Sequence, residues 1–133
     1  KRVRAHACTD VTGFGFAGHA WEMASGSSMG IKIYLHDLPI FDNVLELIRE
    51  GIIDGSSNMN KNSFSKNIEI KPNVLSEYQT LIYSSETSGG LLIAVPEDQA
   101  EKIITDLHAT GLEMAAVVGE ITDDHPGIVE VCQ

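Results

Sequence analysis

Apolar residues recur at steps of three and four in four stretches of the chain, and this spacing predicts four amphipathic helices. The stretches cover residues 16–26, 44–50, 74–83 and 96–111. We expect Thr12 to cap the first helix and Asp42 the second, because either side chain can accept a hydrogen bond from a backbone N–H of the first turn. Pro96 suits the first position of the last helix, and Gly111 should end it.

Alternating or continuous apolar runs predict strands at 31–35, 91–95, 115–121 and 128–131. The run 91–95 is uninterrupted, which favours a central strand. The last two strands flank a polar turn cluster and are expected to pair as a hairpin. Residues 54–71 are mostly Gly, Ser, Asn and Lys and predict a long loop. The order of elements predicts an α/β sandwich in which helices pack on a mixed, mostly antiparallel sheet of about four strands.

Length and charge narrow the possible functions. A chain of 133 residues fits a single domain. Its net charge of -10 argues against nucleic acid and against anionic membranes as partners. Its two cysteines are too far apart in sequence for a zinc motif, and a reducing cytoplasm is the expected location. The first residue is Lys1 rather than Met, so we expect a fragment of a longer polypeptide.

A glycine-rich motif near the start carries the candidate chemistry. Residues 9–18 read TDVTGFGFAG, with Gly13, Gly15 and Gly18 at G-x-G-x-x-G spacing and Asp10 just ahead of them. Glycines let backbone N–H groups approach an anion closely. A carboxylate repels phosphate unless a divalent cation lies between them. The residues alone therefore suggest either a dinucleotide site or a magnesium–phosphate site.

The dinucleotide interpretation fits less well. Asp37 ends a predicted strand downstream, where a ribose-binding acid would lie, but Asp-Leu-Pro is also a common strand-ending turn. The residues ahead of Gly13 are too polar for the buried strand that precedes a dinucleotide loop. His6, Cys8 and His19 do not have the spacing of a metal site and are expected to be ordinary packed or paired side chains.

Two motifs in the same order resemble those of one enzyme family. The first is TDVTGFG followed by a helix carrying His19, Glu22 and Met23; the second is TSGGLLIAVP at 87–96. Together they resemble the C-terminal domain of selenophosphate synthetase, also called selenide, water dikinase, within the aminoimidazole ribonucleotide synthetase-like superfamily. The likeness extends over essentially the whole chain. It departs at 84–86, where Ser-Ser-Glu stands in place of the family's Asp-Pro-Gln.

The resemblance implies a phosphotransferase that converts ATP, selenide and water to selenophosphate, AMP and phosphate. The family enzyme is a homodimer of two-domain chains, and its catalytic Cys or selenocysteine lies on the N-terminal domain. Cys8 is therefore not expected to be the nucleophile, and the fragment alone should be inactive. Asp10 matches the family's metal-binding Asp and would share Mg²⁺, bound with ATP, with acids of the other domain.

The hydroxyls and glycines of the two motifs are expected to lie close to the phosphates or the nucleotide, because they can present donors to an anion. They are Thr9, Thr12, Gly13, Gly15, Thr87, Ser88, Gly89 and Gly90. For 87–90, a tight turn into the following strand explains the sequence equally well. The alternatives for the whole chain are a stand-alone nucleotide-binding or regulatory module, another ATP-dependent synthetase of the superfamily, and a dimerisation domain without a site.

Overall fold

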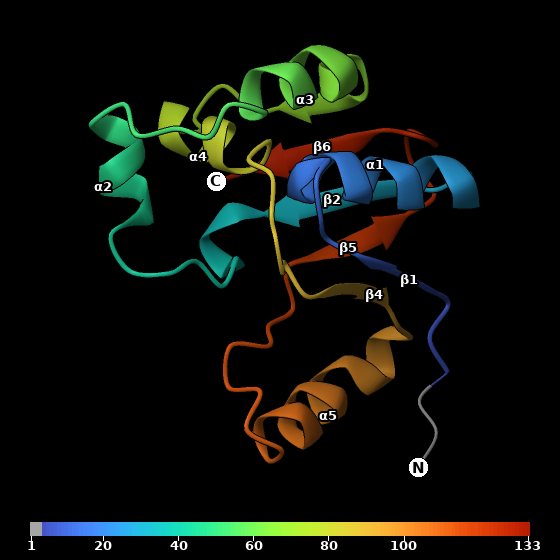
Figure 1. Ribbon diagram of the computed structural model, residues 1–133. Coiled ribbons are helices and arrows are strands. Elements are labelled where there is room, and N and C mark those ends of the chain that lie inside the picture. Colours follow the sequence, from blue (N-terminus) through green and yellow to red (C-terminus); the bar gives the residue numbers. More distant parts are fainter. Residues whose placement is uncertain (1–3) are drawn as a thin grey trace.

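The computed structural model describes residues 4–133 and contains a four-stranded and a two-stranded sheet (Figure 1). The larger sheet has the order β3 (Ile68–Ile70), β6 (Val129–Cys132), β2 (Gly30–Tyr34) and β5 (Gly119–Thr122). Strand β6 runs parallel to both β3 and β2, whereas β5 is antiparallel to β2. The predicted α/β architecture with a mixed four-stranded sheet is confirmed, although two of the three pairings in this sheet are parallel.

The predicted terminal hairpin is wrong, because β2 lies between β5 and β6. The polar cluster after β5 carries the chain across the end of β2 instead of turning it back on itself. There the N–H of Gly127 donates to the carbonyl of Met29, and the N–H of Ile31 donates to the carbonyl of Ile128. Gly30 permits this crossing, since a Cβ atom there would lie 2.0 Å from the carbonyl oxygen of Asp124.

The predicted loop 54–71 is also wrong. It forms helix α3 (Ser57–Phe64), the short 3₁₀ helix η2 (Ser65–Asn67) and strand β3. The sequence is polar because only one side of this segment is covered, chiefly through Phe64 and Ile68. Phe64 packs on the helix that follows the glycine motif, where a Cβ at Gly18 would lie 2.9 Å from its ring. Tertiary contact therefore stabilises a helix with little amphipathic signal of its own.

Strands β1 (Ala7–Asp10) and β4 (Leu91–Ala94) form the separate two-stranded antiparallel sheet. The sequence did not predict β1, whose residues are largely polar. The strand predicted at 91–95 exists, but the prediction that it is central is wrong. It belongs to the two-stranded sheet, and Leu91 and Ile93 are 65% and 42% exposed. Helix α5 (Glu97–His108) follows Pro96 as predicted, and it lies apart from the four-stranded sheet (Figure 1).

The remaining helices are α1 (Gly15–Ser27), α2 (Val44–Arg49) and α4 (Ser76–Leu81), with a 3₁₀ turn, η1 (Leu35–Asp37). Both predicted caps are wrong: Phe14 and Asn43 occupy the N-cap positions, and neither makes a side-chain capping bond. The Thr12 hydroxyl is hydrogen-bonded to His19 instead.

The core lies between α1 and the four-stranded sheet. Alternation along β2 and β6 turns Ile31, Ile33, Val129 and Val131 toward it. The helix contributes small residues, which let it approach the sheet closely. The fully or nearly fully buried members from α1 are Ala17, Ala20 and Ala24. This packed layer supports the glycine motif at the start of α1.

Candidate functional site

The β1–β4 ladder brings the two sequence motifs together. Asp10, the last residue of β1, is paired with Leu91, the first residue of β4. Beyond this pair the N–H of Val11 donates to the carbonyl of Gly90 at 3.0 Å, and the N–H of Gly89 donates to the carbonyl of Val11 at 3.1 Å. The glycine motif and the loop 87–90, far apart in sequence, therefore form one continuous surface.

The glycines of this surface have different structural reasons. A Cβ at Gly89 would lie 2.6 Å from the carbonyl oxygen of Val11, and Gly15 has a φ of +72° with its Cβ position 2.7 Å from the carbonyl oxygen of Ser84. At both positions the neighbouring backbone leaves no room for a side chain, so glycine is required. At Gly13 nothing lies within 4 Å of the Cβ position. Space is thus left open in front of Gly13, on the exposed side of the loop.

Asp10 points away from the packed side of the ladder and is exposed. Among residues 4–133, His, Cys, Asp and Glu side chains form no group of three or more that could hold a metal ion. The exposed residues Thr87 and Ser88 lie in the loop that is joined to Val11. The arrangement offers one carboxylate for a cation, together with hydroxyls and open backbone suited to an anion.

Two side chains hold the glycine loop from behind, and the sequence did not reveal either. The carbonyl oxygen of Gly13 accepts hydrogen bonds from Asn60 Nδ2 at 2.8 Å and from Ser85 Oγ at 2.6 Å. The same Asn60 amide donates to the carbonyl of Tyr83 at 2.9 Å. Asn60 is buried on α3, inside the segment predicted to be a loop, so its role depends on a fold that the sequence pattern did not indicate.

A cluster of hydroxyls extends this support to Asp54. Its carboxylate accepts hydrogen bonds from both the backbone N–H and the hydroxyl groups of Ser56 and Ser57. Burial alone would raise the pKa of Asp54, but these bonds outweigh it and hold the pKa well below the usual range. The Ser56 hydroxyl in turn contacts Ser85 Oγ. Burial, and then the charge of Asp54, raise the pKa of the nearby Glu86.

A further side-chain contact reaches Thr12, in the middle of the motif. His19 is only 6% exposed, and its Nε2 lies 3.1 Å from Thr12 Oγ1. Its Nδ1 lies 2.9 Å from Glu22 Oε2, one turn further along α1. The ring of Phe14 stacks on the imidazole, with centroids 5.4 Å apart. The prediction that His19 is a packed and paired side chain therefore agrees with these contacts.

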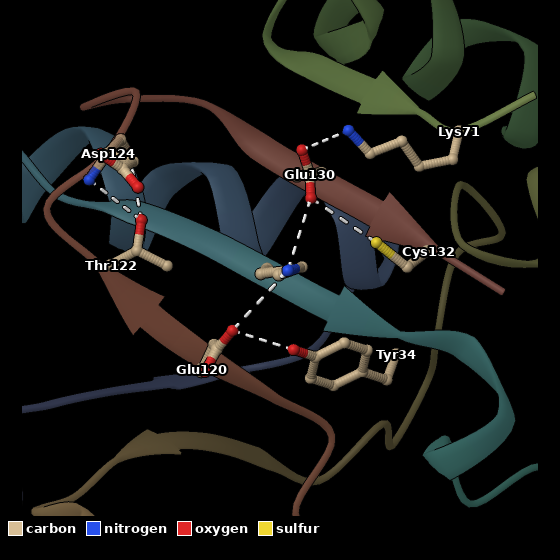
Figure 2. A network of polar contacts seen from close by, with 8 residues as sticks. Tyr34, Lys71, Glu120, Thr122, Asp124, Glu130 and Cys132 are labelled. Carbon is tan, nitrogen blue, oxygen red and sulfur yellow. Dashed lines mark hydrogen bonds and ion pairs between the residues drawn. The ribbon is translucent and has the colours of Figure 1, made fainter.

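Charged residues gather elsewhere, on the face of the four-stranded sheet opposite α1 (Figure 2). Lys32 lies 3.9 Å from both Glu120 and Glu130, and Lys71 pairs with Glu130. The Tyr34 hydroxyl donates to Glu120 at 2.8 Å, which raises the pKa of Tyr34. Each charge has a neighbour of opposite sign, and none of these residues belongs to the two loops. This network accounts for the polar side of the sheet without a ligand.

The comparisons with known proteins agree with this architecture. Residues 1–132 match the family model of the AIR synthase related protein, C-terminal domain. The chain belongs to this family. A selenide, water dikinase from Pelobacter propionicus is 41% identical over 119 residues, covering 90% of the chain and 34% of that protein. The selenide, water dikinase of Porphyromonas gingivalis ATCC 33277 is 40% identical over 116 residues, covering 86% of the chain and 33% of that protein.

The relatives are longer than this AIR synthase related domain, which spans about a third of their length. A chain in the crystal structure of a HypE–HypF complex shares its fold, with a TM-score of 0.61 at 22% identity over 94% of the domain and 32% of that chain. Within the described part of the domain, none of the helices has the length and apolar character needed to cross a membrane. The resemblance seen in the sequence is thus confirmed at the level of family and fold.

Proposed function

We propose that this domain is the C-terminal part of a selenide, water dikinase and that it contributes Asp10 to a Mg–ATP site. The relatives of this name support the reaction class. The observation that carries the site is the pairing of Asp10 with Leu91, which joins an exposed carboxylate to the loop 87–90. In the proposed reaction the full-length protein converts ATP, selenide and water to selenophosphate, AMP and phosphate.

The donor set fits a shared magnesium site. Mg²⁺ takes six oxygen ligands and usually keeps only one or two carboxylates beside phosphates and waters. Asp10 supplies one such carboxylate, and the preceding part of the longer protein would supply the others. When bound, the ion offsets the negative charge of the phosphates and aligns their oxygens. Residues 1–133 are proposed as one domain of a two-domain chain that forms a cytoplasmic homodimer.

The other site residues would act around this carboxylate. The open space at Gly13 lets a ligand approach the backbone, and the exposed Thr87 and Ser88 place hydroxyls beside it. Gly15, Gly89 and Gly90 shape the two loops through close packing or a positive φ. The Thr9 hydroxyl donates to the carbonyl of its neighbour Asp10 at 3.3 Å and would stiffen the end of β1.

Asp10→Asn in the full-length protein tests the proposal. The neutral amide keeps the size of the side chain but removes the charge that a cation needs, so we expect selenide-dependent AMP formation to fall on the order of 100-fold or more. Circular dichroism should be unchanged, because Asp10 is exposed. Asp123→Asn, at an exposed position in the connection between β5 and β6, is the matched control. Full activity in Asp10→Asn would refute the assignment.

Two alternatives are distinguished by separate measurements. A stand-alone nucleotide-binding module would bind ATP by itself, so calorimetry of the 133-residue chain with ATP and Mg²⁺ should then give micromolar affinity. The proposal predicts little binding, because the chain holds a single carboxylate at the site. Another ATP-dependent synthetase of the superfamily would form AMP or ADP without selenide, whereas the proposal requires selenide for turnover.

A further inference from the structure

The buried imidazole of His19, which lies between Thr12 and the more exposed carboxylate of Glu22, fixes where the Thr12 hydroxyl proton lies. The carboxylate of Glu22 can only accept hydrogen bonds when it is ionised, so the 2.9 Å contact places a proton on His19 Nδ1. In the neutral imidazole Nε2 then carries a lone pair and must accept. The partner 3.1 Å away is Thr12 Oγ1, which therefore donates its proton inward, toward the helix.

The surroundings hold this geometry in place. His19 is 6% exposed and lies under the ring of Phe14, so the imidazole has little room to turn. The carbonyl of Thr12 accepts hydrogen bonds from the N–H groups of Gly15 and Glu86, at 3.1 and 3.0 Å, which fixes the backbone of the residue. Carboxylate–histidine pairs of this kind set the tautomer of the ring and the direction of the group beyond it.

We infer that His19 and Glu22 are positioning residues that make the Thr12 hydroxyl an acceptor toward the cation side of the site. Because its hydrogen is directed at His19 Nε2, Thr12 Oγ1 offers only lone pairs outward. A lone pair suits Mg²⁺ or the hydrogens of its bound water, and it repels a phosphate oxygen. This inference rests on the proposed Mg–ATP site. The sequence predicted only that Thr12 lies near the phosphates or the nucleotide, whereas the inference assigns Thr12 a contact with the hydrated cation.

The tautomer of His19 is tested first, by a measurement that does not require enzyme activity. Full-length protein labelled with ¹⁵N-histidine is examined by NMR at about pH 8, where an imidazole is ordinarily neutral. The His19 signal is assigned from its loss in His19→Gln. We expect the proton on Nδ1; a proton on Nε2 would overturn the inference. The spectrum does not depend on Asp10, so this result stands apart from the test of the proposed function.

Cation binding is tested second, in Thr12→Val. We expect Mn²⁺ binding in the presence of ATP, measured by electron paramagnetic resonance, to weaken about tenfold, as is typical when ligands near a metal are disturbed. The Mg²⁺ concentration for half-maximal turnover should rise equally, while KM for ATP at saturating Mg²⁺ changes less than about twofold by the same reasoning. His19→Gln should likewise weaken Mn²⁺ binding and raise the Mg²⁺ concentration for half-maximal turnover.

Two controls separate a role at the site from a role in folding. Thr12→Ser keeps the hydroxyl and should restore cation binding to near the parent value. Thr105→Val removes a hydroxyl that bonds only within α5, to the carbonyl of Glu101, and should leave cation binding unchanged. An unchanged Mn²⁺ affinity in Thr12→Val together with a raised KM for ATP would overturn the inference in favour of a phosphate contact.

Discussion

The four-stranded sheet with its helices and the part formed by β1, β4 and α5, which lies below it in Figure 1, differ in how completely their side chains are buried. The four-stranded sheet, α1 and the segments that pack around them contain the fully buried side chains, including Leu35 of η1, Ile82 after α4 and Val129 of β6. The β1–β4 ladder and α5 contain none, and their apolar residues are at best half-buried. A two-stranded sheet is marginal by itself in water. Asp10 is thus presented by the weaker region, while its loop is held by the stronger one.

The contrast teaches how the site gains its shape. The hydrogen bonds from Asn60 and Ser85 to Gly13, and the contact of His19 with Thr12, come from the packed region. The exposed face of the ladder carries Leu91 and Ile93 near Asp10. The glycine loop is therefore held by the packed region, whereas the carboxylate of Asp10 lies at the end of the less buried ladder.

The largest expected effect on stability compares a residue of the core with a residue of α5. Leu35→Ala removes a fully buried side chain and should lower the free energy of unfolding by about 2–5 kcal/mol. Leu107→Ala, on the half-buried face of α5, should cost about 1 kcal/mol or less, because fewer contacts are lost. Urea unfolding followed by circular dichroism measures both. Equal losses would show that the region around α5 is packed as tightly as the sheet.

The next effect concerns the junction between the regions. Gly15→Ala forces a side chain into a positive φ and against the carbonyl of Ser84, and should cost about 1–3 kcal/mol in thermal unfolding. Gly13→Ala is the matched control, with open space around its Cβ position and an expected change within about 0.5 kcal/mol. In the full-length protein Gly13→Ala should instead raise KM for ATP. An unaltered KM would remove Gly13 from the site.

The smallest expected effect on stability concerns Glu86, which lies near Asp54 in the hydroxyl cluster behind the glycine loop. The pKa of Glu86 is raised, first by burial and then by the charge of Asp54, so its ionised form costs stability above that pKa. Glu86→Gln should therefore stabilise the protein at pH 7 by no more than about 0.5 kcal/mol. The gain should vanish below about pH 4, where the unfolded-state carboxyl is also protonated.

Thermal unfolding at the two pH values measures this difference. Glu113→Gln, at an exposed position, serves as the control and should show no pH-dependent gain. A gain from Glu86→Gln that persisted at low pH would mean that its charge is not the cause.

Local patterns predicted the helices well and the strand pairings poorly. The stripe at 16–26 and the Pro96 start gave α1 and α5, because a helix is stabilised by contacts within one segment. Strand β1 was missed, since its alternation is polar and its partner β4 lies far along the chain. Helix α3 was missed because Phe64 and Asn60 gain their partners only in the fold.

By itself the sequence determined the family, the mixed α/β class and the prediction of Asp10 as a metal ligand, since these follow from residue types at fixed spacing. Only the tertiary structure decided that β6 pairs with β2 rather than with β5, and that the loop 87–90 lies beside Asp10. It alone placed His19, Asn60 and Ser85 around the glycine loop. The physical reason is that such contacts join segments distant in sequence, and their free energy arises only when the packed core holds those segments together.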